Sequence, residues 1–234
     1  ESFMSVAIFL RFFIMVAVSV LLAGCSNVNR LYLETLRLAF FEDGPSLSLQ
    51  QVRESKVDFL KVLHGERLPV YMALAYIEDG QNKWVSADHV VVAMDQDKII
   101  RISGLDIDLQ YTDNLQGNPL RATSQLTDAS WKYHIDVEEH HYGLPVNSQW
   151  QRGAPQQVTF YDKAFTVIPV TETVSIDIDK PYWTHETSWQ NVYWLEQTSG
   201  QIIYSEQKAT PNSDLMKMTF VSRIARLINA REAN

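Results

Sequence analysis

Short apolar segments separated by turn residues follow one another along most of this chain, and they restrict its fold more than any other feature. In residues 105–111 and again in 174–178, apolar and polar residues alternate with the period of two that is typical of a half-buried strand. Many short strands with few helices predict a mainly β fold, an antiparallel β-barrel or sandwich with short peripheral helices. The predicted strands cover residues 57–63, 70–77, 83–94, 98–103, 105–111, 131–137, 157–170, 172–178, 191–196, 201–207 and 216–226, the last passing into a short helix.

Turn signals set the expected order of these strands. Asp79-Gly80, between two apolar segments, predicts a hairpin whose loop covers residues 78–82. With a further turn at 95–97, residues 70–111 are expected to form an antiparallel meander. The polar stretch 112–128 is expected to be a loop or a short irregular helix. Two helices are predicted before the strands, at 27–41 and at 49–54, the second with Ser48 as its N-cap.

The apolar run at residues 12–25, FFIMVAVSVLLAGC, contains the only cysteine of the chain. It is too short to span a bilayer comfortably and fits the apolar region of a signal peptide. Its end, Leu-Ala-Gly-Cys, resembles a bacterial lipobox, in which the cysteine is acylated and becomes the mature N-terminus. The alternatives are an ordinary signal peptide with a coincidental cysteine, or a core helix. We therefore expect a leader at 1–24, lipidation (palmitate included) of Cys25, and translation from Met4.

Composition limits what the remaining residues, 25–234, can be. With 46% hydrophobic residues the chain can bury a core, and it is expected to form a single domain in which 25–55 provide a tether and N-terminal helices. Its net charge of −8, without a basic cluster, argues against nucleic acid as a partner. Since Cys25 is the only cysteine, the mature chain has no internal disulfide.

Several stretches together resemble the YjbF/GfcB family of group 4 capsule and exopolysaccharide lipoproteins, which includes YmcC-like proteins. The likeness covers most of residues 25–226. It implies a mainly β fold and a role in making or exporting surface polysaccharide, without a catalytic mechanism that could be transferred residue by residue. The stretches are the lipobox, KWVSAD at 83–88 with IIRISGL at 99–105, and NVYWLE at 191–196 with SGQIIYSEQ at 199–207.

The sequence contains no G-x-S-x-G elbow, phosphate loop or G-x-G-x-x-G. The carboxylate pairs Asp106/Asp108 and Asp177/Asp179 have a spacing that could serve a glycosidase, but on a strand they lie on the face opposite the apolar residues, so solvated surface charge is the favoured interpretation. No catalytic residue is predicted, and the chain is expected not to be an enzyme.

One cluster of possible metal ligands and one group of aromatic residues complete the candidates. His134 and residues 138–141 (EEHH) are compatible with zinc, yet neighbouring residues of a strand point to opposite faces, so neither a metal nor another cofactor is predicted. Trp150, Trp183 and Trp189 lie in polar, turn-rich sequence and are expected to be exposed, where they could bind carbohydrate. Trp84 and Trp194, within apolar strands, are expected in the core.

Together these patterns predict a non-catalytic accessory in the assembly or export of exopolysaccharide or capsule. Ser26, which follows the lipobox cysteine, favours the outer membrane, with the domain facing the periplasm. The expected partners are the membrane, through the lipid anchor, other export proteins, and the polysaccharide itself. The alternatives left open are a periplasmic enzyme that modifies polysaccharide and a structural envelope lipoprotein without a glycan role.

Overall fold

The computed structural model describes residues 46–138, 141–178 and 186–233. The predicted leader, Cys25 and the predicted helix 27–41 lie outside this part of the chain, whereas the compact unit formed by residues 42–234 is almost completely described. Its helical segments are α3 (Leu49–Glu54), η1 (Leu115–Gly117), η2 (Pro119–Gln125) and α4 (Val221–Glu232). None of the helices in the described ranges has the length and apolar character needed to cross a membrane.

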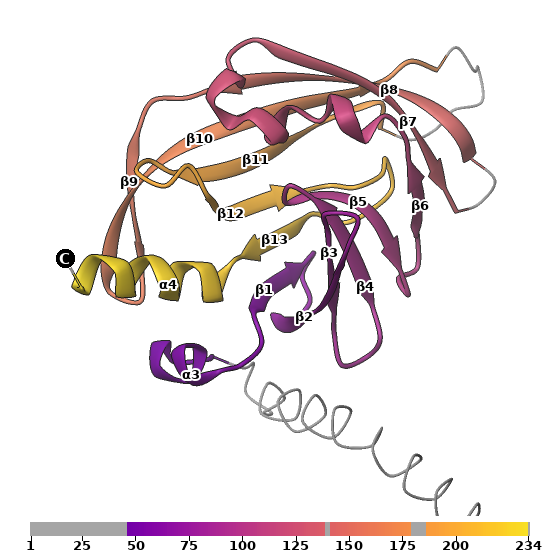
Figure 1. The fold of residues 1–234 in the computed structure, drawn as a ribbon. Helices are drawn as coiled ribbons and strands as arrows, with labels where there is room; N and C mark the ends of the chain where they lie inside the picture. The colour runs from indigo at the N-terminus through magenta and orange to yellow at the C-terminus, as the bar shows by residue number, and fades with distance from the viewer. Residues whose placement is uncertain (1–45, 139–140, 179–185, 234) are drawn as a thin grey trace, which may run out of the picture. The chain divides into compact units, whose positions relative to one another are not determined.

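Thirteen strands form one sheet in which every pairing is antiparallel (Figure 1). They are β1 (Phe59–His64), β2 (Val70–Glu78), β3 (Gln81–Val85), β4 (Val91–Asp95), β5 (Lys98–Ser103), β6 (Leu109–Thr112), β7 (Ala129–Val137), β8 (His141–Arg152), β9 (Gln156–Phe160), β10 (Lys163–Ile176), β11 (Ser188–Glu196), β12 (Ile202–Gln207) and β13 (Met216–Thr219).

The sheet curls into a nearly closed barrel. Its strand order is β5-β4-β3-β2-β1-β13-β12-β11-β10-β8-β7-β6, and β9 pairs with β10 outside this path. The two end strands meet where the Thr112 hydroxyl of β6 donates a 2.8 Å hydrogen bond to the Ile100 carbonyl of β5. The predicted mainly β fold is thus confirmed in its barrel form, and so is the meander from β2 to β5.

Two-residue turns join several neighbouring strands. Both residues of the Asp79-Gly80 turn have positive φ, as in a type I′ turn, whose twist matches that of a hairpin. Glu78 pairs directly with Gln81. The predicted five-residue loop at 78–82 was therefore too long, because the strands continue to the turn itself. Turns at Gln96-Asp97 and Tyr161-Asp162 have the same pair of positive φ values.

Three predicted strand boundaries were wrong. Residues 83–94 form two strands, β3 and β4, separated by a turn in which the Ser86 amide donates to the Val90 carbonyl. Residues 104–108 are not a strand. The Asp108 carboxylate accepts hydrogen bonds from the amides of Gly104 and Leu105, and this local turn chemistry prevails over the alternating pattern. The segment 157–170 is divided by the Tyr161-Asp162 turn, and β10 then continues without a break to Ile176.

The longest segment that the sequence pattern failed to predict as a strand is β8. This twelve-residue strand contains Gly143 and Pro145, residues that normally indicate a turn. Its inward positions nevertheless alternate regularly, with Leu144, Val146 and Trp150 buried in the core. Pairing with long strands on both sides, β7 and β10, provides the order that the local sequence does not indicate.

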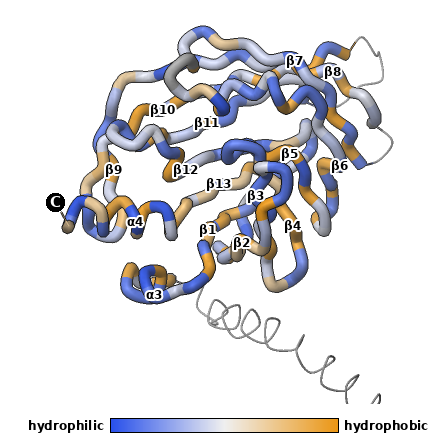
Figure 2. The backbone as a smooth tube through the Cα atoms, in the orientation of Figure 1, coloured by the Kyte–Doolittle hydropathy of each residue, from blue (hydrophilic) through white to orange (hydrophobic). Residues whose placement is uncertain are grey.

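Among the described residues, two apolar clusters stand out, one inside the barrel and one outside it. The larger cluster draws on nearly every strand and fills the interior. The smaller one lies under α4, where Ile224 and Ile228, four residues apart on one face of the helix, pack with Phe165, Val167 and Ile203. Apolar and polar residues alternate along many of the strands (Figure 2). The predicted helix 49–54 is confirmed, with Ser48 as its N-cap in a capping box.

Candidate functional site

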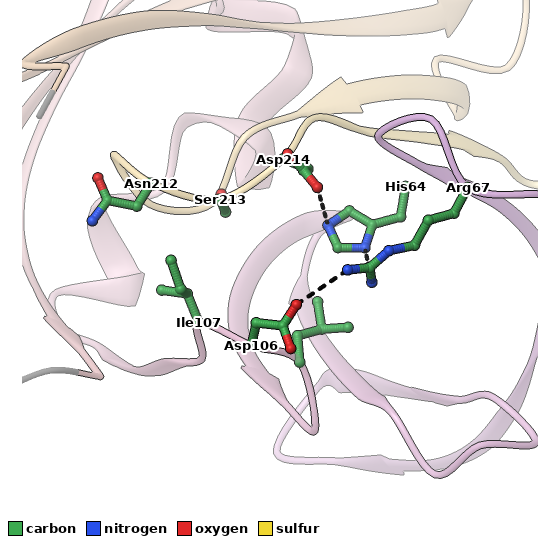
Figure 3. A pocket seen from close by; sticks show the side chains of 8 residues that line it. His64, Arg67, Asp106, Ile107, Asn212, Ser213 and Asp214 are labelled. Carbon is green, nitrogen blue, oxygen red and sulfur yellow. Dashed lines mark hydrogen bonds and ion pairs between the residues drawn. The ribbon is translucent and has the colours of Figure 1, made fainter.

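A hollow with several ionisable side chains lies at the end of β1 (Figure 3). Its volume is about 130 Å³. Three loops that are far apart in the sequence meet here: 64–67 after β1, 105–107 before β6, and 212–214 before β13. Gly65 allows this approach, because its φ is +58° and a Cβ at this position would lie 2.9 Å from the Asp214 carboxylate.

The charged groups of this hollow form a chain. His64 Nε2 lies 4.0 Å from Asp214, and the other ring nitrogen lies 3.2 Å from Arg67 Nη1. Arg67 in turn donates to Asp106 at 3.2 Å. Burial, followed by the positive charge of Arg67, lowers the pKa of His64 below 6.5, although the two carboxylates oppose this shift. His64 is therefore neutral at pH 7.

The nearby hydroxyl of Ser213 is engaged in its own turn. It accepts hydrogen bonds from the amides of Ala209 and Thr210 and donates to the Thr210 carbonyl. A catalytic serine would instead direct its proton to a base such as His64. In this geometry the polar groups of the hollow hold three loops together through hydrogen bonds and ion pairs.

A second group of polar residues lies inside the barrel, around Glu172 of β10. This carboxylate is fully buried and accepts from Lys98 at 2.8 Å, Asn191 at 2.8 Å and Tyr193 at 3.1 Å. All three hydrogen bonds end on one carboxylate oxygen, Oε2. The other oxygen, Oε1, has no hydrogen-bond partner among the described residues. Burial, and then the charge of Glu172, raise the pKa of Tyr193 well above its ordinary value, so the phenol stays protonated as a donor.

Residues 95–98, at the turn between β4 and β5, form three ion pairs with distant parts of the chain. Asp95 pairs with Arg121 of η2 at 2.5 Å, and Lys98 pairs with Glu172. Asp97 pairs with Arg223 of α4 at 2.6 Å. A four-residue turn thus connects two helical segments and a distant strand. None of these residues was predicted as a candidate from the sequence. The sequence feature that could have indicated this buried polar group is Glu172, a charged residue at an inward position of the apolar strand β10, between Val170 and Val174.

The predicted carbohydrate-binding tryptophans are not exposed where the structure describes them. Trp150 is 0% exposed and stacks on Tyr193, and its indole N–H donates to Ser148. Trp189 is 8% exposed, and its N–H donates to the Lys208 carbonyl. Their expected exposure was wrong, because polar sequence around a residue does not determine which face of a strand it occupies. Trp183 lies outside the described residues, as does Cys25.

Trp194 shows the opposite error. Predicted to be in the core, it faces outward from β11 and is only partly buried, next to Tyr204 at 4.3 Å between ring centroids and Phe160 at 6.4 Å. Trp84 is buried, as predicted.

The remaining candidates are surface groups where they can be described. Asp106 and Asp177 are exposed, and Asp106 is held by Arg67. His134 pairs with Asp113 at 2.9 Å. Among the described residues no group of three His, Cys, Asp or Glu is arranged to hold a metal ion, while Asp179, Glu139 and His140 lie outside this part of the chain.

Comparison with solved structures first defines the class of fold. The crystal structure of the hypothetical lipoprotein YmcC from Escherichia coli (K12) is similar with a TM-score of 0.67, over 80% of this chain and 93% of that chain. At 21% sequence identity, this similarity shows a shared fold.

Sequence comparison then identifies the family. Residues 33–221 match the family described as group 4 capsule polysaccharide lipoprotein GfcB, YjbF. The chain belongs to this family, and the resemblance noted from its motifs is confirmed. The uncharacterized lipoprotein GfcB of Escherichia coli (strain K12) is 25% identical over 127 residues, which are 52% of this chain. The alignment spans 58% of that relative's length.

Proposed function

We propose that this protein is an outer-membrane lipoprotein, anchored through acylated Cys25, that serves as a non-catalytic accessory in the assembly or export of capsule or exopolysaccharide. Membership of the capsule lipoprotein family carries the proposal. The lipobox Leu22–Cys25 supports attachment to a membrane, and Ser26 supports the outer membrane. Acylation with two or more chains gives stable attachment.

The buried acidic residues favour a non-catalytic role. Each buried carboxylate in the described part of the chain is paired with a cation: Asp95 with Arg121, Asp97 with Arg223, Glu172 with Lys98, and Glu196 with Arg231. A general acid needs a carboxyl group that can give up and regain a proton near neutral pH. Carboxylates fixed in ion pairs serve the fold instead.

The hollow at His64 supports one alternative, an enzyme that modifies polysaccharide. A neutral imidazole next to Asp214 could act as a general base. If it does, His64→Gln should abolish function in cells while the folded protein reaches normal levels. If the hollow is structural, this variant should complement a deletion strain whenever it folds.

A deletion strain tests the proposed function itself. Loss of the gene should reduce surface polysaccharide while the sugar precursors are still made, because the proposed step follows synthesis. The wild-type gene should restore the polysaccharide, and Cys25→Ser should not, because only the thiol can be acylated. Crosslinking in the intact envelope should capture another export component. Normal surface polysaccharide in the deletion strain, under conditions in which the gene is expressed, would contradict the proposal.

A further inference from the structure

A second hollow, distinct from that at His64, lies where β1, β2 and β3 meet the beginning of α4. Its volume is about 150 Å³, and Figure 1 shows α4 leaving β13 next to β1 on this side of the barrel. Asp58, Ile77 and Asn82 line it together with Trp84, Phe220 and Arg226.

Trp84 provides the first sign of a ligand. Its side chain is 3% exposed and packs edge-to-face on Phe220, with ring centroids 6.3 Å apart. Within the described residues its indole N–H is buried without a hydrogen-bond acceptor. Such an unsatisfied donor is uncommon, because losing the bond to water costs free energy that a protein partner normally replaces. Trp84 lines the hollow, so an acceptor oxygen bound there could reach this N–H once a neighbouring side chain moves.

The other polar groups suit hydroxyl groups better than a charged ligand. Asp58 and Arg226 form a two-pronged ion pair, with bonds of 2.6 Å and 3.0 Å, so their charges cancel. Asn82, which pairs with Ile77 across the β2–β3 hairpin, has a side-chain amide with no hydrogen bond to any described residue. Amide, carboxylate and guanidinium groups together offer both donors and acceptors, which is what a hydroxyl group requires.

The hollow also has an apolar wall. Ile77, which is 63% exposed, and Leu74 both line the hollow. At about 30 Å³ for each water-sized group, a hollow of about 150 Å³ has room for roughly five such groups, close to the size of one sugar ring. A sugar ring has polar hydroxyls at its rim and C–H groups on its faces, and this hollow presents matching surfaces to both.

We propose that the hollow between the β2–β3 hairpin and α4 binds one sugar ring of a polysaccharide. This inference deepens the proposed function and rests on it for the source of the sugar. The Asn82 amide and the Asp58–Arg226 pair bind hydroxyls, Ile77 contacts the C–H face, and the Trp84 N–H donates to a ring oxygen. The Trp84 nitrogen has almost no exposed surface, so binding includes a small movement of a neighbouring side chain.

The His64 hollow lacks the features on which the proposed sugar site depends. Its ionisable groups bind one another, and none of the described residues that line it is a Trp, Tyr or Phe. It has nearly the same volume, which makes it a matched control.

Binding can be followed at the indole N–H itself. The full-length lipoprotein in detergent micelles would be titrated with oligosaccharides released from the strain's own surface polysaccharide by mild acid hydrolysis. The ¹H–¹⁵N signal of the Trp84 indole, assigned by its loss in Trp84→Phe, should shift in a saturable manner. Asn82→Ala should weaken binding about tenfold, the effect of losing one good hydrogen bond. Asn212→Ala, in the His64 hollow, should bind as the wild type does.

Two results would overturn this inference: an Asn82→Ala variant with unchanged affinity, or a Trp84 signal that does not move at saturating oligosaccharide. Thermal unfolding of each variant checks that it folds, and the half-buried Asn82 provides the test even if Trp84→Phe does not fold. The deletion strain separates the two proposals. If deletion lowers surface polysaccharide but no binding occurs, only the sugar site fails. If surface polysaccharide is unchanged, the proposed function fails.

Discussion

Glu172 and its partners show what single residues contribute to this fold. The carboxylate lies among apolar side chains of β10, and the interior stays stable because Lys98, Asn191 and Tyr193 all bind it. Lys98 also lies 5.9 Å from the centre of the Tyr133 ring. A buried ion pair adds little stability by itself, but removing one partner leaves an uncompensated charge in a medium of low polarity.

We expect Lys98→Met to lower the free energy of unfolding by about 3–5 kcal/mol, since Glu172 would lose its cation while remaining buried. Denaturant unfolding measures this change. Lys132→Met, on an exposed position of β7, is the matched control and should have an effect within about 0.5 kcal/mol. Equal stability of the two variants would show that Glu172 does not depend on Lys98.

His64 should make stability depend on pH. Its pKa in the folded protein lies below 6.5, so the unfolded chain binds the proton more readily. The contribution of His64 is therefore fully present above pH 6.5 and is lost as the pH falls through the lowered pKa. The difference in unfolding free energy between the wild type and His64→Gln should shrink between about pH 7.5 and pH 5.

Asn212→Ala provides the control for this titration, because it changes a residue of the same hollow that carries no ionisable group. Its stability difference from the wild type should stay constant over the same pH range. A difference for His64→Gln that stays constant, or grows as the pH falls, would show that burial does not disfavour the charged imidazole.

At the scale of elements, the segment η1–η2 depends on a close contact with β7. A Cβ at Gly117 of η1 would lie 2.8 Å from the Trp131 ring, which is buried and donates its indole N–H to the Asn114 carbonyl. Next to it, the Asn118 side chain caps η2 and donates to Asp95. One glycine therefore allows the connection between β6 and β7 to pack onto the barrel.

Gly117→Ala should lower the free energy of unfolding by about 1–3 kcal/mol, because the rigid indole cannot move aside without breaking its hydrogen bond. The neighbouring Gln116→Ala is the control, since Gln116 is exposed on the same turn. Thermal and denaturant unfolding should place Gln116→Ala near the wild type. If both variants are equally stable, the segment can move away from Trp131 at no cost.

At the scale of the whole molecule, the predicted anchor and the barrel are separate in the chain. The compact unit begins at Glu42, whereas the acylated residue is expected to be Cys25. The compact unit is also stabilised by ion pairs between its own elements, such as that of Arg53 in α3 with Glu232 in α4 at 2.8 Å. Anchoring and folding should therefore be independent.

Cys25→Ser should lose partition into the detergent phase while keeping the thermal unfolding midpoint of the wild-type domain. Phase partitioning and circular dichroism on the same preparations measure the two properties. Mass spectrometry of the wild type should find an acylated Cys25 at the mature N-terminus. An unmodified cysteine there would contradict the lipobox interpretation.

Local patterns in the sequence were enough for the class of fold and for many of its elements. Alternation of apolar and polar residues reflects the geometry of a single strand, so β2, β5, β7 and β12 could be recognised without knowing their neighbours. The N-cap Ser48 and the turn at Asp79-Gly80 are equally local, because each depends on the chemistry of a few consecutive residues. The lipobox and the family motifs can also be read from consecutive residues.

Tertiary structure alone decided which face of each strand became the interior, and hence the sites. Trp150 is buried inside the barrel against expectation, and Trp194 packs on its outer face, in the cluster under α4. Burial depends on how the sheet curls, which no single strand specifies. The strand β8 became ordered by its partners in spite of Gly143 and Pro145. Both hollows join residues more than a hundred positions apart, His64 with Asp214 and Trp84 with Phe220, and only closure of the barrel brings such residues together.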